Sequence, residues 1–269
     1  MAGNSGEHGQ SVASRLLRII DAFDADAPEL GLAEIGRRTG LPPATLHRLL
    51  GELVRHGAIE RTGSGRYAVG LRLWEIGQLA PRAARVDEVC MPFLADLYEA
   101  THGTLHLAVR QDREALYVVA IPDHHPVRPL VRAGTRVPLT SPGVGEVLLA
   151  HAVPDLIEQV LGTGSSRPVN RLRRRLAEIR RSGVAVARDA RSVVVAAPLY
   201  SAPNRVVAAL SVAVPPSHAN RVPSLLIRLT ADSISRELRG RRADLPSSEP
   251  PGRSTPIVRQ QLSGDPLQP

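Results

Sequence analysis

Hydrophobic residues between positions 32 and 53 recur with the period of an α-helix and predict two helices separated by a turn. The second helix carries one apolar stripe, formed by Leu46, Leu49, Leu50 and Leu53. Gly40 stands where the first helix must end, since glycine accepts the left-handed backbone of a helix end. Pro42 and Pro43 suit the first turn of a helix, where the missing N–H would be unpaired anyway. The pattern indicates a helix-turn-helix over residues 32–51.

The face of the second helix opposite the leucines is built from small and polar side chains. At about 100° per residue, Ala44 and Arg48 fall on that face, and Thr45 flanks it. Small residues let a helix approach DNA closely, while hydroxyl, imidazole and guanidinium groups bond phosphates and base edges. The candidate DNA-binding residues of this helix are Pro43, Ala44, Thr45, His47, Arg48 and Arg55. For this segment alone, an ordinary helical hairpin with solvated charges is the alternative.

The flanking segments favour a winged form of the helix-turn-helix. Ser11 is placed to cap a preceding helix with one apolar face, and Gly57 ends the second helix of the motif. Residues 58–61 and 66–69 then predict a hairpin around a glycine-rich turn at 62–65. Arg61 and Arg66 flank the hairpin tip, where they could reach a phosphate backbone or a minor groove, and they complete the candidate DNA-binding set.

The rest of the chain predicts an α+β fold. Apolar residues from Leu71 to Leu79 indicate a helix that leaves the wing and is broken near Pro81, and we expect Trp74 to pack against the winged unit. Helices are predicted at 86–100, 143–150, 155–161 and 225–238, and strands at 104–110, 115–120, 184–187, 193–197 and 206–214. Such an alternation makes a domain in which helices cover an antiparallel sheet.

The same patterns divide the chain into five parts. Polar residues 1–10 predict a disordered lead, and residues 241–269, rich in Pro, Ser, Gln and Gly, predict a disordered tail. Between them we expect a winged helix-turn-helix domain at 11–70, a linker helix at 71–85 and a second domain at 86–240.

Net charge supports nucleic-acid binding only through local clustering. The chain carries a formal charge of +8, but residues 1–80 hold nine arginines against nine acidic residues. Within 37–66, six arginines outnumber Glu52 and Glu60. The basic run at 171–175 lies on a predicted helix with an apolar face, and a solvated surface is the favoured interpretation over a second nucleic-acid site.

Composition also limits the chemistry. Cys90 is the only cysteine, so the chain has no intramolecular disulfide and no cysteine-based zinc site, and we expect it in a core. We predict no metal site, no cofactor and no membrane partner. Residues 1–10 lack the apolar stretch of a signal peptide, and no apolar run spans a bilayer, which favours a cytoplasmic protein.

Several spaced motifs together resemble the IclR family of transcriptional regulators. They lie at 11–15, 32–35, 40–42, 45–50, 57 and 66–70, and a weaker likeness continues at 106–109, 134–139, 148–150, 196–198 and 206–211. The resemblance implies a winged domain joined by a linker helix, which helps to pair protomers, to a GAF-like effector domain. It also implies a homodimer, or a tetramer, on a double-stranded DNA operator, with a small metabolite as effector.

The implied effector pocket lies between the sheet and the loops around the 143–150 helix, and this chain departs from the family there. Glu146 stands where the family usually has a lysine after glycine, Val194 replaces a cysteine, and Ala213 replaces the second serine after Ser211. The candidate effector-binding residues are Gly143, Gly145, Asp189, Val194 and Ser211. Each also has a structural interpretation, as a closely packed glycine, a core residue or a locally bonded strand residue. The effector therefore stays open, and a domain that has lost effector binding is an alternative.

Three classes of function compete. A DNA-binding regulator gated by a metabolite fits the grouped arginines, whether it represses or activates. An enzyme would need a clustered cysteine, a metal set or a Ser-His-Asp arrangement, but the histidines are scattered and the Gly-x-Ser-x-Gly motif is missing, so no catalytic residue is predicted. A protein-interaction module is the third class, and Arg48, Arg55, Arg61 and Arg66 argue against it because they gather where DNA would lie.

Overall fold

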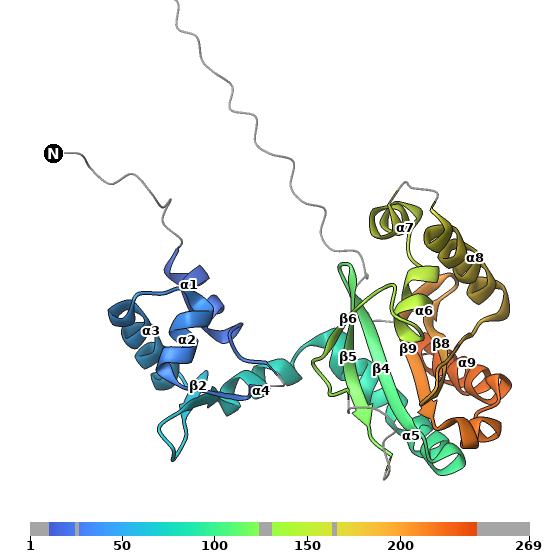
Figure 1. Ribbon diagram of the computed structural model, residues 1–269. Helices are drawn as coiled ribbons and strands as arrows, with labels where there is room; N and C mark the ends of the chain where they lie inside the picture. Colours follow the sequence, from blue (N-terminus) through green and yellow to red (C-terminus); the bar gives the residue numbers. More distant parts are fainter. Residues whose placement is uncertain (1–10, 25–26, 124–130, 163–165, 241–269) are drawn as a thin grey trace, which may run out of the picture.

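The computed structural model describes residues 11–24, 27–123, 131–162 and 166–240. The expected disordered lead and tail lie outside these residues. A small unit and a larger sheet-containing domain occupy the two ends of the molecule in Figure 1, and helix α4 and the start of α5 run between them. The predicted α+β architecture, with an N-terminal winged unit and an antiparallel sheet in the second domain, is confirmed.

The winged unit contains three helices and a three-stranded antiparallel sheet. The helices are α1 (Val12–Ile20), α2 (Leu32–Thr39) and α3 (Pro43–Arg55), and the strands are β1 (Glu29–Leu30), β2 (Ile59–Arg61) and β3 (Tyr67–Val69). Strand order is β1-β3-β2, with Glu29 opposite Ala68 and Glu60 also opposite Ala68 from the other side. The sequence patterns missed β1, because two residues are too short to show an alternation.

Local signals for the helix ends are confirmed. The Ser11 hydroxyl accepts a hydrogen bond from the Ser14 N–H at 3.1 Å and caps α1. Gly40 ends α2 with a φ of 66°, a left-handed conformation in which a Cβ would be strained. Pro43 is the first residue of α3. The leucine stripe of α3 is buried in the core of the unit with Ile19, Leu30 and Ile35.

The region between the domains differs from the expected linker helix. Helix α4 (Leu71–Gln78) is followed by α5 (Pro81–Thr101), so the expected boundary at residue 86 falls inside a helix. Pro81 is the first residue of α5, a position at which proline is tolerated. It therefore starts a new helix where the apolar pattern of residues 71–79 ends. The expected packing of Trp74 against the winged unit is wrong, because this side chain is 61% exposed.

The second domain is a six-stranded antiparallel sheet with helices on both faces (Figure 1). In spatial order the strands are β6 (Arg136–Pro138), β5 (Glu114–Ile121), β4 (Thr104–Gln111), β9 (Arg205–Val214), β8 (Val193–Ala202) and β7 (Ala185–Arg188). The remaining elements are α6 (Val144–Ala150), α7 (Pro154–Leu161), α8 (Arg167–Ser182), a 3₁₀ turn η1 (Pro216–Arg221) and α9 (Ser224–Gly240). The short strand β6 was also not predicted from the sequence.

Two hydrophobic cores lie on opposite faces of this sheet. One core joins α5 and α9 to the sheet and includes the fully buried Cys90, as expected. The other joins α6 and α8 to the sheet through small residues such as Ala108, Ala196 and Ala209. In the strand register, Ser211 lies opposite both His106 and Ala196, so these three residues form one row. Because Ala196 belongs to the second core and side chains alternate along strands, the row faces α6.

Candidate DNA interface and effector site

The outward face of α3 is solvent-exposed. Its leucine stripe is buried against α1 and α2, whereas the candidate residues Pro43, Ala44, His47, Arg48 and Arg55 are exposed and Thr45 is half-buried. Arg55 forms an ion pair with Glu52 on the same helix, and its hydrogen bond lowers the pKa of that carboxyl. Arg55 shares its guanidinium with this carboxylate, while Arg48 lies on the exposed face one turn before Glu52.

Arginines of the inner side of the unit hold α2 in place. The Arg38 guanidinium donates to the Ala22 carbonyl at 2.8 Å and forms ion pairs with Asp24 at 2.7 Å and Glu34 at 2.9 Å. The Arg18 guanidinium donates to the Thr39 carbonyl at 3.1 Å, which satisfies an oxygen at the end of α2. These bonds fix the turn from which α3 starts. Arg38 therefore has a structural role and is not available to DNA in the same way as Arg48.

The two arginines of the wing are in different surroundings. Both Arg61 and Arg66 are exposed, and the turn between them is closed by the Thr62 N–H, which donates to the Arg66 carbonyl at 2.9 Å. The Arg66 guanidinium also donates to the Glu29 carbonyl at 2.7 Å and thereby ties the wing to β1. Because α3 packs against β2, the wing and the α3 face belong to one packed unit.

The candidate effector residues do not all gather at one point. Gly143 and Val194 are brought together, since a Cβ built on Gly143 would lie 3.0 Å from the Val194 Cγ1. A Cβ on Gly145 would lie 2.7 Å from the Pro138 carbonyl oxygen, so this glycine permits close packing of α6 on the chain after β6. Gly143 has a φ of 89°, which also requires glycine.

Asp189 and Ser211 have separate environments. The Asp189 Oδ1 accepts hydrogen bonds from the N–H groups of Arg191 and Ser192, each at 2.8 Å, and so closes the turn between β7 and β8. Ser211 is 2% exposed and lies within the sheet row beneath α6. Asp189 therefore has a local structural role, and Ser211 is the polar candidate closest to the expected pocket.

Glu146, which stands where the family usually has a lysine, forms an ion pair with Arg175. Glu146 is 4% exposed, and its Oε1 accepts a hydrogen bond from the Arg175 Nε at 2.7 Å. The same guanidinium donates to the Val186 carbonyl at 2.6 Å. The pair joins α6, α8 and β7, so Glu146 does not present a bare negative charge to an acidic ligand.

His106 is a buried polar residue that the sequence patterns did not assign to the site. It is 7% exposed, and its Nε2 has no hydrogen-bond partner among the described residues. Burial lowers the pKa of His106 to about 4, so the ring is neutral at pH 7. The ring meets Tyr117 edge-on with centroids 5.1 Å apart. The alternation of residues 104–110 could have placed His106 on the same face as Ser211, but only the strand register makes them neighbours.

Other classes of site are not found in the part of the chain that the structure describes. Its His, Cys, Asp and Glu side chains form no group of three suited to a metal ion. None of its helices combines the length and the apolar character needed to cross a bilayer.

A winged helix-turn-helix with an exposed polar face on its second helix, followed by a helix-covered sheet domain, defines a DNA-binding transcriptional regulator with a separate sensory domain. Comparison of the sequence with known families agrees with this class. Residues 12–63 match the IclR helix-turn-helix domain, and residues 80–236 match the family described as bacterial transcriptional regulator IclR C-terminal. The chain belongs to the IclR family of transcriptional regulators, and the expected resemblance is confirmed.

Individual relatives support the same assignment. The HTH-type transcriptional regulator XynR of Escherichia coli is 31% identical over 75% of this chain and 84% of its own length. The DNA-binding transcriptional repressor YiaJ of Escherichia coli is 26% identical over 83% of this chain and 85% of its own length. A crystal structure of an IclR homologue from Microbacterium hydrocarbonoxydans, complexed with 4-hydroxybenzoate, is 31% identical, with a TM-score of 0.79 over 86% of this chain and all of that chain. The two Escherichia coli relatives are named as transcriptional regulators.

Proposed function

We propose that this chain is a homodimeric regulator that reads its operator with α3 and the wing, and that a small effector bound beside α6 changes its operator affinity. The observation that carries the proposal is the exposed face of α3 on a fully packed winged unit. Pro43, Ala44, Thr45, His47 and Arg48 would approach the major groove, with Arg48 contacting a base edge. Arg55, Arg61 and Arg66 would contact phosphates.

Exposed apolar residues on the connecting helix support a homodimer. Leu71, Trp74 and Leu79 are 62%, 61% and 77% exposed, and Ile76 is 49% exposed. Large apolar side chains that gather on one short helix are typical of a protein interface. A second copy of this chain would cover them and set the spacing of two winged units on operator half-sites. Sedimentation of the purified chain measures this state directly.

The effector would bind on the α6 side of the sheet, near the Ser211 row. Ser211 and the neutral His106 supply hydrogen-bonding groups there, while Gly143, Gly145 and Val194 shape the wall under α6. Pockets of this kind are mainly apolar with a few polar groups. The structural relative with 4-hydroxybenzoate makes that compound the natural first probe.

A ligand-independent regulator is a second candidate. The close contacts of Gly145 with the Pro138 carbonyl and the turn-closing bonds of Asp189 give both residues structural roles that need no ligand. In that case the same DNA binding would occur without any response of the second domain.

The test is binding of the full chain to DNA from beside its own gene at two salt concentrations, with competitor DNA present. Salt-sensitive binding that survives the competitor is expected, because phosphate contacts release counterions while base contacts give specificity. Addition of 4-hydroxybenzoate should then change the operator affinity by about 5- to 150-fold, the usual size of allosteric coupling. Specific binding that no related phenol or benzoate changes would favour the ligand-independent candidate. Loss of all binding in competitor would contradict sequence-specific recognition of this DNA.

A further inference from the structure

Helix α8 carries a local excess of positive charge. This helix carries seven arginines and a single acidic residue, Glu178, which gives it a net charge of +6, while the whole chain has +8. Its apolar face is ordinary, since Leu176 and Ile179 are buried against the core beneath α6. The arginines are therefore not required for the amphipathic pattern, which other polar residues would satisfy equally well.

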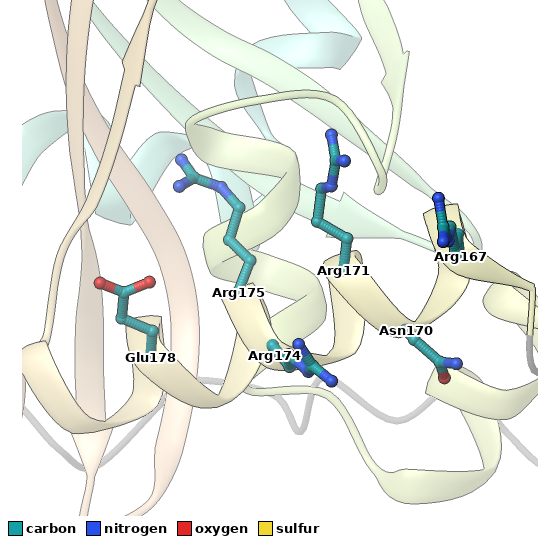
Figure 2. Close-up of a pocket in the computed structure, with 6 residues that line it drawn as sticks. All are labelled: Arg167, Asn170, Arg171, Arg174, Arg175 and Glu178. Carbon is teal, nitrogen blue, oxygen red and sulfur yellow. The ribbon is translucent and has the colours of Figure 1, made fainter.

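A groove lies along α8. It has a volume of about 700 Å³ and is lined by Arg167, Asn170, Arg171, Arg174, Arg175 and Glu178. Figure 2 shows these side chains projecting from successive turns of the helix, with Arg171 and Arg175 pointing to the same side. Four guanidinium groups thus border one groove with a single carboxylate.

Three arginines of α8 are bonded to the rest of the domain, and three others nearer its start are not. Arg173 forms an ion pair with Glu158 on α7, Arg175 pairs with Glu146, and Arg180 donates to the Ala150 carbonyl. Arg167, Arg171 and Arg174 are exposed and have no hydrogen bond or ion pair within the described ranges. Their spacing of four and three residues puts these three on one stripe of the helix. The first set attaches α8 to the domain, and the second set, which we call the α8 stripe, is free to bind a partner.

Like charges at this spacing destabilise a helix, and an anionic partner would relieve the repulsion within the α8 stripe. Guanidinium groups suit phosphates because their planar forks donate two parallel hydrogen bonds. Phosphate is also the anion that this regulator must meet. Its winged unit is formally neutral over residues 1–80, and electrostatic attraction to phosphates supplies nearly all non-specific DNA affinity. The charge that the winged unit lacks is found on α8.

We propose that the α8 stripe binds the phosphate backbone of duplex DNA outside the operator half-site, without reading its sequence. The inference rests on the proposed function, because it takes DNA as the polymer that the protein binds. It adds phosphate contacts from the second domain to those proposed for Arg55, Arg61 and Arg66. The α3 face reads the bases, and the α8 stripe adds sequence-independent attraction that depends on salt.

The test uses the full chain and a duplex of about 60 base pairs of arbitrary sequence, for which only phosphate contacts contribute. The variant R167Q/R171Q/R174Q removes the α8 stripe. The control R188Q/R191Q/R228Q removes three exposed arginines of the same domain and lowers the net charge equally. If three phosphates are contacted, the slope of log affinity against log salt should fall by about 2.7 in the stripe variant and by much less in the control. Replacement of the same three residues by lysine should retain most of the slope.

Each contrary outcome identifies a different error. An equal loss in the stripe variant and the control would show that only total charge matters, and would overturn the proposal. An unchanged slope in the stripe variant, together with weakened operator binding in Arg48→Ala, would overturn the α8 proposal and leave the proposed function intact. Failure of the wild-type chain to bind any duplex would overturn both. A change in oligomeric mass without a change in slope would identify a second copy of the chain as the occupant and would also overturn the proposal.

Discussion

Helices α3 and α8 have the same construction on their buried sides and opposite construction on their exposed sides. Each places leucine or isoleucine in a core, with Leu49 at 1% exposure and Leu176 at 2%. The exposed face of α3 carries small residues and two arginines, one of them paired with Glu52, whereas α8 carries seven arginines. A face that must enter a groove needs to be narrow and selective. A face that only attracts phosphates needs charge, and shape matters less.

The surroundings of the two helices reinforce this difference. Helix α3 lies in a unit whose other arginines, Arg18 and Arg38, are used to hold the turn before it. Helix α8 uses Arg173, Arg175 and Arg180 to attach itself to neighbouring helices and leaves the α8 stripe unpaired. In both regions some arginines therefore hold the fold together, while others are exposed to solvent and open to a partner.

The largest expected effect is a loss of stability when a buried leucine of either helix is removed. Leu49→Ala and Leu176→Ala should each lower the free energy of unfolding by about 2–5 kcal/mol, because each leaves a cavity in a close-packed core. Denaturant unfolding of the purified variants measures the loss. Leu229→Ala is the control, since Leu229 is 53% exposed and its loss should change stability by less than about 0.5 kcal/mol. Equal stability of Leu49→Ala and the control would contradict the packing described for the winged unit.

The next effect is a pH dependence of stability that arises from His106 in the second domain. Burial lowers the pKa of His106 to about 4 from 6.5, so the unfolded chain binds more protons between these values. This titration leaves the free energy of unfolding at its full value above pH 6.5. As pH falls from 6.5 towards 4, the free energy of unfolding of the effector domain decreases by about 3 kcal/mol. Chemical unfolding at pH 7, 5.5 and 4 follows the loss.

The variant His106→Gln should flatten this pH dependence. The control is His102→Asn, because His102 is exposed and has a φ of 46°, a conformation that asparagine tolerates. A pH dependence that stays the same in His106→Gln and in wild type would mean that His106 is not the group that titrates. Carboxyl groups also titrate in this range, so the difference between the two variants is the measured quantity.

The smallest effect tests the division of tasks directly. Arg48→Ala should weaken operator binding by about 1–3 kcal/mol while leaving binding to arbitrary DNA nearly unchanged, because a base contact contributes only to the correct sequence. Competition binding with operator and scrambled duplexes measures both quantities. Arg72→Ala is a suitable control, since Arg72 is exposed on α4 and paired with Glu75. If Arg48→Ala bound the operator normally, the α3 face would not be the reading surface described here.

The elements with strong local signals were predictable from the sequence. The leucine period of α3, the left-handed Gly40 and the capping by Ser11 all depend on residues within a few positions of each other. The main strands of the second domain were also predicted, although β8 extends to Ala202, five residues beyond the expected end at 197. The expected boundary at residue 86 was less successful, because Pro81 fits the first turn of α5 as well as the end of a pattern.

The candidate sites divide along the same line. The α3 face could be predicted from helical spacing alone, since one helix carries all of it. The residues around Ser211 come from several segments, and their neighbours depend on strand register and on how α6 lies over the sheet. For this reason His106 was not recognised beside Ser211, and the pairing of Glu146 with Arg175 across 29 positions could not be foreseen.

The sequence by itself determined the class of this protein, its helix-turn-helix and the apolar faces of its helices, because these depend on periodicity and on turn chemistry within short segments. Only the tertiary structure decided which polar groups are free. Within the described residues, Trp74 is exposed, Glu146 forms an ion pair with Arg175, the His106 Nε2 is buried without a hydrogen-bond partner, and the α8 stripe has no ion pair. The physical reason is that burial, ion pairing and desolvation depend on contacts between residues far apart in the chain, and these contacts exist only after the chain has folded.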